Sequence, residues 1–221
     1  MQTIKRLSIL VGLATVMPAL AQAQQQQQPQ PMTFFVTSVG SGEGGNLGGL
    51  EGADAHCQNL AEAAGRGDAT WRAYLSQAPG GGMQRVDARD RIGDGPWHNA
   101  KGELIAQNVA DLHEDRNNIR KDNALNESGE PVNGRGDQPN RHDMLTGSDS
   151  MGRLFDTNPA VATCNNWTSS SNDHTARLGH HDRLGGPNAS WNSVHTSRGC
   201  SQEALIGTGG DGLFYCFALQ E

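Results

Sequence analysis

The chain has little of the material that builds a large apolar core. Aromatic residues make up 5% of its 221 residues, and hydrophobic residues of all kinds make up 35%. Glycine is abundant instead, with 29 residues, and glycine at this frequency interrupts helices, which excludes a coiled coil or a helical bundle. A small core needs other support, and the four tryptophans and four cysteines can supply it.

Basic residues are scarce as well. Lysine and arginine total 17 against 24 aspartates and glutamates, so the formal net charge is −7 at pH 7. Such a chain repels phosphate overall, and a nucleic-acid partner is not expected. Beyond the N-terminus, no apolar run approaches the ~20 residues that a membrane-spanning helix needs, so no membrane span is expected.

The N-terminus is typical of a secretory signal peptide. Lys5 and Arg6 form a charged start, Leu7–Leu20 is apolar, and Ala21-Gln22-Ala23 fits the small-x-small cleavage pattern. We therefore expect an exported protein, periplasmic or extracellular. The predicted organisation is a signal peptide at 1–23, a Gln/Pro-rich linker at 24–31 and one domain at 32–221.

All four cysteines lie after the predicted signal peptide. The closest two, Cys200 and Cys216, are sixteen residues apart, too far for the close pairs of a cysteine zinc site. An even number of cysteines in an exported chain implies disulfides, and the spacing alone leaves three pairings open.

Three segments carry clear secondary-structure patterns. Residues 33–39 are rich in β-forming side chains and predict a first strand. Residues 52–64 place Cys57 among small and apolar side chains on one helical face, which predicts a helix whose cysteine faces the core. Residues 213–219 are apolar on both faces and predict a central strand that is covered on both sides.

Two further segments contrast with each other. Residues 70–76 alternate, which predicts a strand with Trp71, Ala73 and Leu75 inward and Arg72 and Tyr74 outward. Residues 113–143 are almost free of apolar side chains and predict a long, partly disordered surface loop. The Arg135-Gly136-Asp137 tripeptide within that loop is interpreted as incidental.

The order of several short motifs is familiar. These are GGNLGGLEGADAHCQNLAEAAG (44–65), TWRAYLS (70–76), LTGSDSMGRL (145–154), CNNWTSSS (164–171) and a closing GCSQEALIG…LFYCFAL. Together they resemble the bacterial, secreted endostatin-like domains, a branch of the C-type-lectin-like fold that is often labelled lectin. The resemblance implies an α+β fold with two helices, a twisted antiparallel sheet and paired terminal strands. It also implies the disulfides Cys57–Cys216 and Cys164–Cys200.

The lectin label implies a non-catalytic module that binds carbohydrate or another extracellular polymer. Trp191 with Asn192 is the expected surface pair for stacking on a sugar, whereas Trp71 and Trp167 are expected in the core. The polar contacts are expected from the loops between 164 and 195, namely Asn165, Asn166, His180, His181 and Asp182.

Calcium is a possible cofactor, although its motif is incomplete. Gln138-Pro139-Asn140 is similar to the triplet that supplies Ca²⁺ ligands in sugar-binding C-type lectins. The family's Trp-Asn-Asp motif is present only as Trp191-Asn192-Ser193, so a carboxylate that Ca²⁺ prefers is missing. No cofactor is firmly implied.

Two alternatives come from other functional classes. One is a protein-binding adhesion or matrix-binding module that uses the 113–143 loop. The other is a metal-dependent enzyme that uses a histidine-rich stretch, since imidazoles and carboxylates together can bind Zn²⁺ or Ni²⁺. That stretch contains Asp173, His174, His180, His181, Asp182 and His195. No Gly-x-Ser-x-Gly motif is present and no catalytic residue is assigned, so we expect a protein that is not an enzyme.

Overall fold

The computed structural model describes residues 30–114, 116–183 and 190–220. The predicted signal peptide and most of the predicted linker lie outside these residues. Within them, no helix is both long and apolar enough to cross a membrane.

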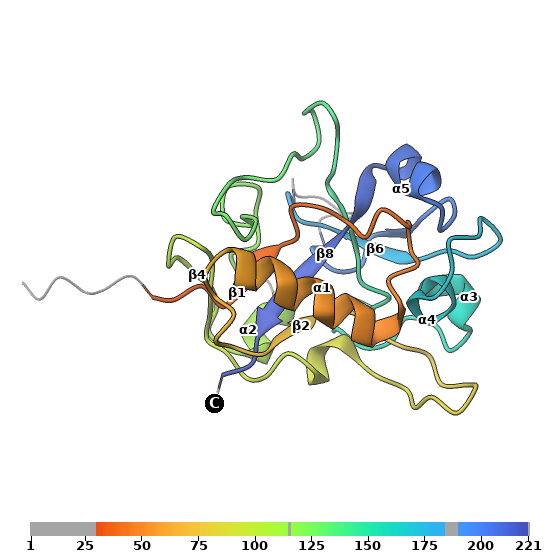
Figure 1. Ribbon diagram of the computed structural model, residues 1–221, viewed down its shortest axis with the longest axis horizontal. Helices are drawn as coiled ribbons and strands as arrows, with labels where there is room; N and C mark the ends of the chain where they lie inside the picture. The colour runs from red at the N-terminus through yellow and green to blue at the C-terminus, as the bar shows by residue number, and fades with distance from the viewer. Residues whose placement is uncertain (1–29, 115, 184–189, 221) are drawn as a thin grey trace, which may run out of the picture.

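The domain has a mixed α+β fold built around one six-stranded sheet (Figure 1). The order along the sheet is β1-β8-β5-β6-β7, and β2 also pairs with β8. Its strands are β1 (Phe34–Val36), β2 (Trp71–Ala73), β5 (Asp143–Leu145), β6 (Arg177–His180), β7 (His195–Thr196) and β8 (Gly210–Ala218). A separate pair consists of β3 (Trp97–His98) and β4 (Leu104–Ala106).

Five helices are found among the described residues. They are α1 (Gly49–Ala63), α2 (Val109–His113), α3 (Pro159–Ala162), α4 (Cys164–Trp167) and α5 (Gln202–Thr208), and a short 3₁₀ turn, η1, covers Ala88–Asp90. The expectation of two helices is therefore too low, because three of the five are single turns of four or five residues that periodicity does not reveal.

Strand β8 is the centre of the sheet. It runs antiparallel to β1 and β2, which confirms that the terminal strands pair, but parallel to β5. The resemblance implied an antiparallel sheet, and this prediction is wrong for the pairing of β5 with β8. A parallel pair needs a long connection between its strands, and here that connection contains β6, β7 and α5.

Both faces of β8 are buried, which confirms the prediction for this strand. Phe214, Cys216 and Ala218 pack under α1 with Trp71 and Trp167. Leu213, Tyr215 and Phe217 pack into a second cluster with Phe34, Trp97 and Trp191. Alternate side chains of a strand point to opposite faces, so one strand serves two cores. Helix α1 lies across the first of them (Figure 1).

Two disulfides stabilise this arrangement. Cys57 of α1 bonds to Cys216 of β8, and Cys164 bonds to Cys200. Both pairings implied by the resemblance are confirmed, and Cys57 faces the core as its helical position predicts. The bonds join positions 159 and 36 residues apart in sequence, so both restrict the unfolded chain substantially.

Two predictions about exposure are wrong. Tyr74 was expected to point outward, but it is fully buried because the second core covers that face. The 113–143 segment is not simply a surface loop. Its few apolar side chains, including Ile119, Ala124 and Val132, pack into the second core, and the Leu125 carbonyl accepts a hydrogen bond from Val36 of β1.

Candidate metal centre

Strand register brings three polar side chains to one place. Asp143 begins β5 and lies opposite His180 of β6, while His195 begins β7 and lies opposite Leu178. Directly opposed and diagonal residues of neighbouring strands share a face of the sheet, so Asp143, His180 and His195 converge. His142 precedes β5, and its ring stacks on that of His180 with the centroids 4.0 Å apart.

The four side chains of His142, Asp143, His180 and His195, here called the His/Asp cluster, meet around one oxygen. The Nε2 atoms of His180, His142 and His195 lie 3.0, 3.3 and 3.4 Å from Oδ1 of Asp143. His180 Nε2 and His195 Nε2 are 3.0 Å apart. The Asp143 side chain is 2% exposed and that of His195 is 38% exposed, so the cluster is accessible from the side of His195.

These short distances do not form a satisfied hydrogen-bond network. Both carboxylate oxygens of Asp143 are buried without a hydrogen-bond partner of acceptable geometry. Nδ1 of His195 donates to the Thr196 carbonyl, so in the neutral ring Nε2 carries a lone pair. That lone pair faces His180 Nε2 and the Asp143 carboxylate. A proton on His195 or a cation between these atoms would turn this repulsion into attraction.

The spacing fits a metal ion. In a tetrahedral zinc site with bonds of about 2.0–2.1 Å, neighbouring ligand atoms lie about 3.3 Å apart. Four of the six distances among the ligand atoms of the cluster run from 3.0 to 3.4 Å. The ligand atoms of His142, Asp143 and His180 all lie within 4.8 Å of one another, a group to which His195 does not belong. Three imidazole nitrogens and one carboxylate oxygen are ligand types that zinc commonly takes.

The electrostatics keep Asp143 ionised. Burial opposes its ionisation, but the imidazoles of His180 and His195 outweigh burial and lower its pKa to about 2. In turn, the contact with Asp143 raises the pKa of His195, against the opposing effect of burial. At neutral pH the centre therefore contains a buried carboxylate, which a divalent cation can neutralise.

Asp182 contacts His142 of the cluster on the ring nitrogen that does not face Asp143. Its Oδ1 lies 3.4 Å from Nδ1 of His142, and its Oδ2 accepts a hydrogen bond of 2.6 Å from the backbone N–H of Arg135. Burial opposes its ionisation, but these contacts prevail and its pKa is lowered. Histidines that bind metals usually donate their other N–H to a carboxylate or carbonyl, and Asp182 is placed for that role.

A glycine leaves space beside the ligand atoms. A Cβ at Gly209 would lie 3.2 Å from His142 Nε2 and 3.3 Å from Asp143 Oδ2. It would also lie 3.2 Å from Nδ2 of Asn140, so the predicted calcium triplet Gln138-Pro139-Asn140 ends beside the His/Asp cluster. Gly209 has a φ of 132°, which side-chain-bearing residues rarely adopt.

The histidine-rich stretch supplies only part of the cluster. His180 and His195 meet in the cluster and Asp182 adjoins it, but His181 points away and donates from Nε2 to the Asn133 carbonyl. His174 bonds to the Ser169 hydroxyl instead.

His142 and Asp143 were missed because they end the segment interpreted as a loop. The available signal was the His-Asp dipeptide directly before apolar Met144-Leu145, which repeats the His-Asp at 181–182.

The expected surface pair is wrong, because Trp191 and Asn192 are 3% and 0% exposed. The Trp191 ring packs 4.6 Å from that of Tyr74 and donates from Nε1 to the Leu112 carbonyl. The second core covers this side of β8, so the indole cannot stack on a sugar from solvent. Trp71 and Trp167 are buried as predicted.

The other predicted polar contacts do not share a surface with this pair. Asn166 is buried, and its amide bonds to both the N–H and the carbonyl of Ala78. Asn165 is exposed and donates to Thr168. The structure thus brings together His180 and Asp182 from the predicted set, and it places Asn165, Asn166 and His181 in separate hydrogen-bond networks.

Another buried histidine has a structural role. His113 donates from Nδ1 to the Val109 carbonyl, so its Nε2 accepts from the Tyr74 hydroxyl at 2.7 Å. The same hydroxyl accepts from Nδ2 of Asn192. Burial lowers the pKa of His113 to about 4, so this ring is neutral in the folded protein at pH 7.

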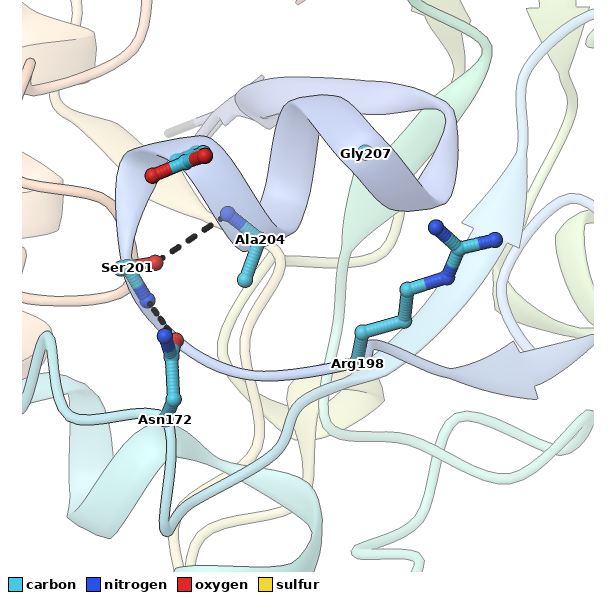
Figure 2. A pocket seen from close by; sticks show the side chains of 6 residues that line it. Asn172, Arg198, Ser201, Ala204 and Gly207 are labelled. Atoms are coloured by element: carbon cyan, nitrogen blue, oxygen red, sulfur yellow. Dashed lines mark hydrogen bonds between the residues drawn. The ribbon is translucent and has the colours of Figure 1, made fainter.

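A hollow of about 430 Å³ lies beside α5 (Figure 2). Its lining residues are Asn172, Arg198, Ser201, Glu203, Ala204 and Gly207. The Ser201 hydroxyl accepts from the Ala204 N–H, and Asn172 Oδ1 accepts from the Ser201 N–H. Figure 2 shows Arg198 on the opposite side of the hollow from these two groups. The polar groups therefore serve the start of the helix and do not converge on one point.

Comparison with known proteins gives no family assignment. No protein-family model matches the chain, and no curated protein is significantly similar to it. The resemblance to endostatin-like domains therefore stays a prediction, as do the carbohydrate or protein ligand and the absence of catalysis.

Proposed function

We propose that this protein is an exported metal-binding domain and that the His/Asp cluster holds a divalent transition-metal ion. The observation that carries the proposal is the convergence of three imidazole Nε2 atoms within 3.4 Å of one buried Asp143 oxygen. The predicted signal peptide and the two disulfides support export.

A transition metal such as zinc fits the donor set better than calcium does. Imidazole nitrogen suits zinc, copper, iron and nickel, whereas Ca²⁺ takes six to eight oxygen ligands. The cluster has one carboxylate and three imidazoles, so calcium lacks oxygen ligands there. His142, Asp143 and His180 would hold the ion from the buried side, and His195 would complete the site from the exposed side.

The backbone carbonyl of Thr196 and the carboxylate of Asp182 would orient two of the ligands. Nδ1 of His195 donates to Thr196, which leaves Nε2 free for a metal. Nδ1 of His142 faces Asp182. Such partners fix the tautomer of each ring and increase its basicity toward a metal. The protein thus presents ligand nitrogens that are already oriented.

The test is calorimetric titration of the oxidised, metal-free mature protein with ZnCl₂. We expect one ion per chain, and a thermal stability that rises with zinc because only the folded chain presents the site. Asp143→Ala and His180→Ala should each weaken zinc binding by at least about 100-fold, since changes to supporting residues alone cost 10–100-fold.

His174→Ala is the matched control, because it removes a half-buried histidine outside the cluster. It should bind zinc as the wild type does. The proposal is refuted if the wild type takes up no zinc, or if Asp143→Ala and His180→Ala bind it as tightly as the wild type.

We also propose that the α+β fold is C-type-lectin-like, as the sequence motifs imply. The paired terminal strands and the two disulfides support this finer assignment. An experimental structure whose strand order differs from that of such domains would contradict it. The fold alone does not identify a ligand.

A further inference from the structure

Asp182 has one carboxylate oxygen on a proposed metal ligand and the other on a surface segment. We infer that Asp182 couples metal binding to residues 133–137, so that an occupied site fixes the conformation of this segment. This coupling rests on the proposed metal site. The exposed residues Arg135 and Gly136 lie at its centre.

The contacts between the segment and Asp182 are close. The Arg135 N–H donates to Oδ2 of Asp182 at 2.6 Å. A Cβ at Gly134 would lie 2.7 Å from the same oxygen, so only glycine fits here without displacement. Next to Asp182, His181 donates to the Asn133 carbonyl at 3.2 Å. Residues 181–182 therefore hold the start of the segment by two hydrogen bonds.

The other end of the segment is held independently. Asp137 accepts from the Gly134 N–H at 2.8 Å and forms an ion pair with Lys121. The side chains of Lys121 and Asp137 are 36% and 34% exposed, and ion pairs that solvent reaches contribute little to stability. Asp182 is 3% exposed, so its contact with Arg135 is the more protected of the two anchors.

The tautomer of His142 links this anchor to the metal site. Nε2 of His142 lies 3.3 Å from Asp143, and Nδ1 lies 3.4 Å from Asp182. A neutral imidazole has only one N–H to offer to these two carboxylates. With its hydrogen on Nε2, it would turn a lone pair toward Asp182 and repel that carboxylate.

A metal on Nε2 removes this conflict. It supplies the positive partner for Asp143 and leaves the N–H on Nδ1, which lies 3.4 Å from Oδ1 of Asp182 and would donate to it. Asp182 is then held in the position that accepts the Arg135 N–H. Without a metal, a neutral ring turns a lone pair toward one of the two carboxylates, and nothing holds its N–H on Nδ1 beside Asp182.

The experiment is hydrogen–deuterium exchange of the full mature protein, followed by mass spectrometry of peptides that cover residues 133–141. Exchange is compared in excess ZnCl₂ and in EDTA, and zinc binding is measured separately by calorimetry. We expect zinc to slow exchange in this region by about 10-fold or more, because local opening governs exchange of such amides. Peptides from residues 50–63 of α1 should change much less.

Two variants test the role of Asp182 directly. Asp182→Asn keeps the size of the side chain but presents an amide, and at saturating zinc it should lose the slowing. Gly134→Ala displaces the segment without touching a ligand. Because coupling between two sites is reciprocal, this variant should lose the slowing and weaken zinc binding by a similar factor, about 10-fold. Asp156→Asn, a carboxylate outside these contacts, should behave as the wild type.

The outcomes separate the two proposals. If the wild type binds zinc one to one but exchange at 133–141 does not change, the coupling is refuted and the metal site stands. Retained slowing in Asp182→Asn or Gly134→Ala also refutes the coupling. If Asp182→Asn does not fold, Gly134→Ala decides. Failure of the wild type to bind zinc overturns both proposals.

Discussion

Acidification should destabilise this protein through His113. The ring is 8% exposed and its pKa is about 4 in the fold, against an ordinary 6.5. Between these values the unfolded chain binds a proton that the folded chain excludes. The stability from His113 is therefore fully present above about pH 6.5 and is lost as the pH falls toward 4.

The magnitude follows from the two pKa values. The complete loss is about 3 kcal/mol, and about 2 kcal/mol of it is lost by pH 5. The pKa values of Asp143 and Asp182 are also lowered. Their stabilisation is lost only as the pH falls below about 4, so they do not contribute between pH 7.5 and 5.

The assay is guanidinium unfolding of the oxidised protein at pH 7.5 and pH 5, in EDTA to exclude metal. His113→Gln keeps an acceptor for the Tyr74 hydroxyl but cannot titrate. Between the two pH values, the free energy of unfolding of the wild type should fall by about 2 kcal/mol more than that of His113→Gln. His195, whose raised pKa acts in the opposite direction, is present in both proteins and cancels.

His174→Gln controls for the removal of a histidine and should keep the pH response of the wild type. An equal loss of stability in the wild type and in His113→Gln would refute the reasoning. It would mean that His113 takes up a proton in the fold as readily as in the unfolded chain.

Two further predictions concern Trp191 and Gly209. Trp191→Ala should lower the free energy of unfolding by about 3–5 kcal/mol, as for other buried aromatics, and a chemical denaturation curve that is unchanged would contradict its place in the second core. Gly209→Ala should weaken zinc binding by about 10-fold or more, comparable to the loss of a supporting residue, because the added methyl group approaches His142 and Asp143 within 3.3 Å. Calorimetry checks it, and unchanged affinity would place the bound ion elsewhere.

Local sequence pattern predicts the burial of an element correctly where each face of that element has uniform surroundings. Residues 213–219 are apolar on both faces, and β8 is indeed covered on both sides. Cys57 lies on the apolar face of its helix and reaches the core. Side-chain periodicity and the geometry of a strand or helix suffice for such predictions.

Exposure of a single aromatic could not be predicted in this way. Trp191 and Asn192 lie in a polar, glycine-rich stretch that predicts a surface. Their burial depends on Tyr74 and Tyr215, which are distant in sequence and pack against the Trp191 ring. The same applies to the 113–143 segment, whose few apolar residues fill gaps beside β1 that the sequence does not reveal.

The sequence by itself determined a disulfide-stabilised α+β domain, a central apolar strand and a stretch that supplies two histidines of the proposed metal centre. Only the tertiary structure decided which residues complete that centre. Antiparallel pairing of β5 with β6 sets Asp143 against His180, and the pairing of β6 with β7 adds His195. Such contacts depend on strand register, which is set by packing across the whole sheet and not by the residues near each ligand.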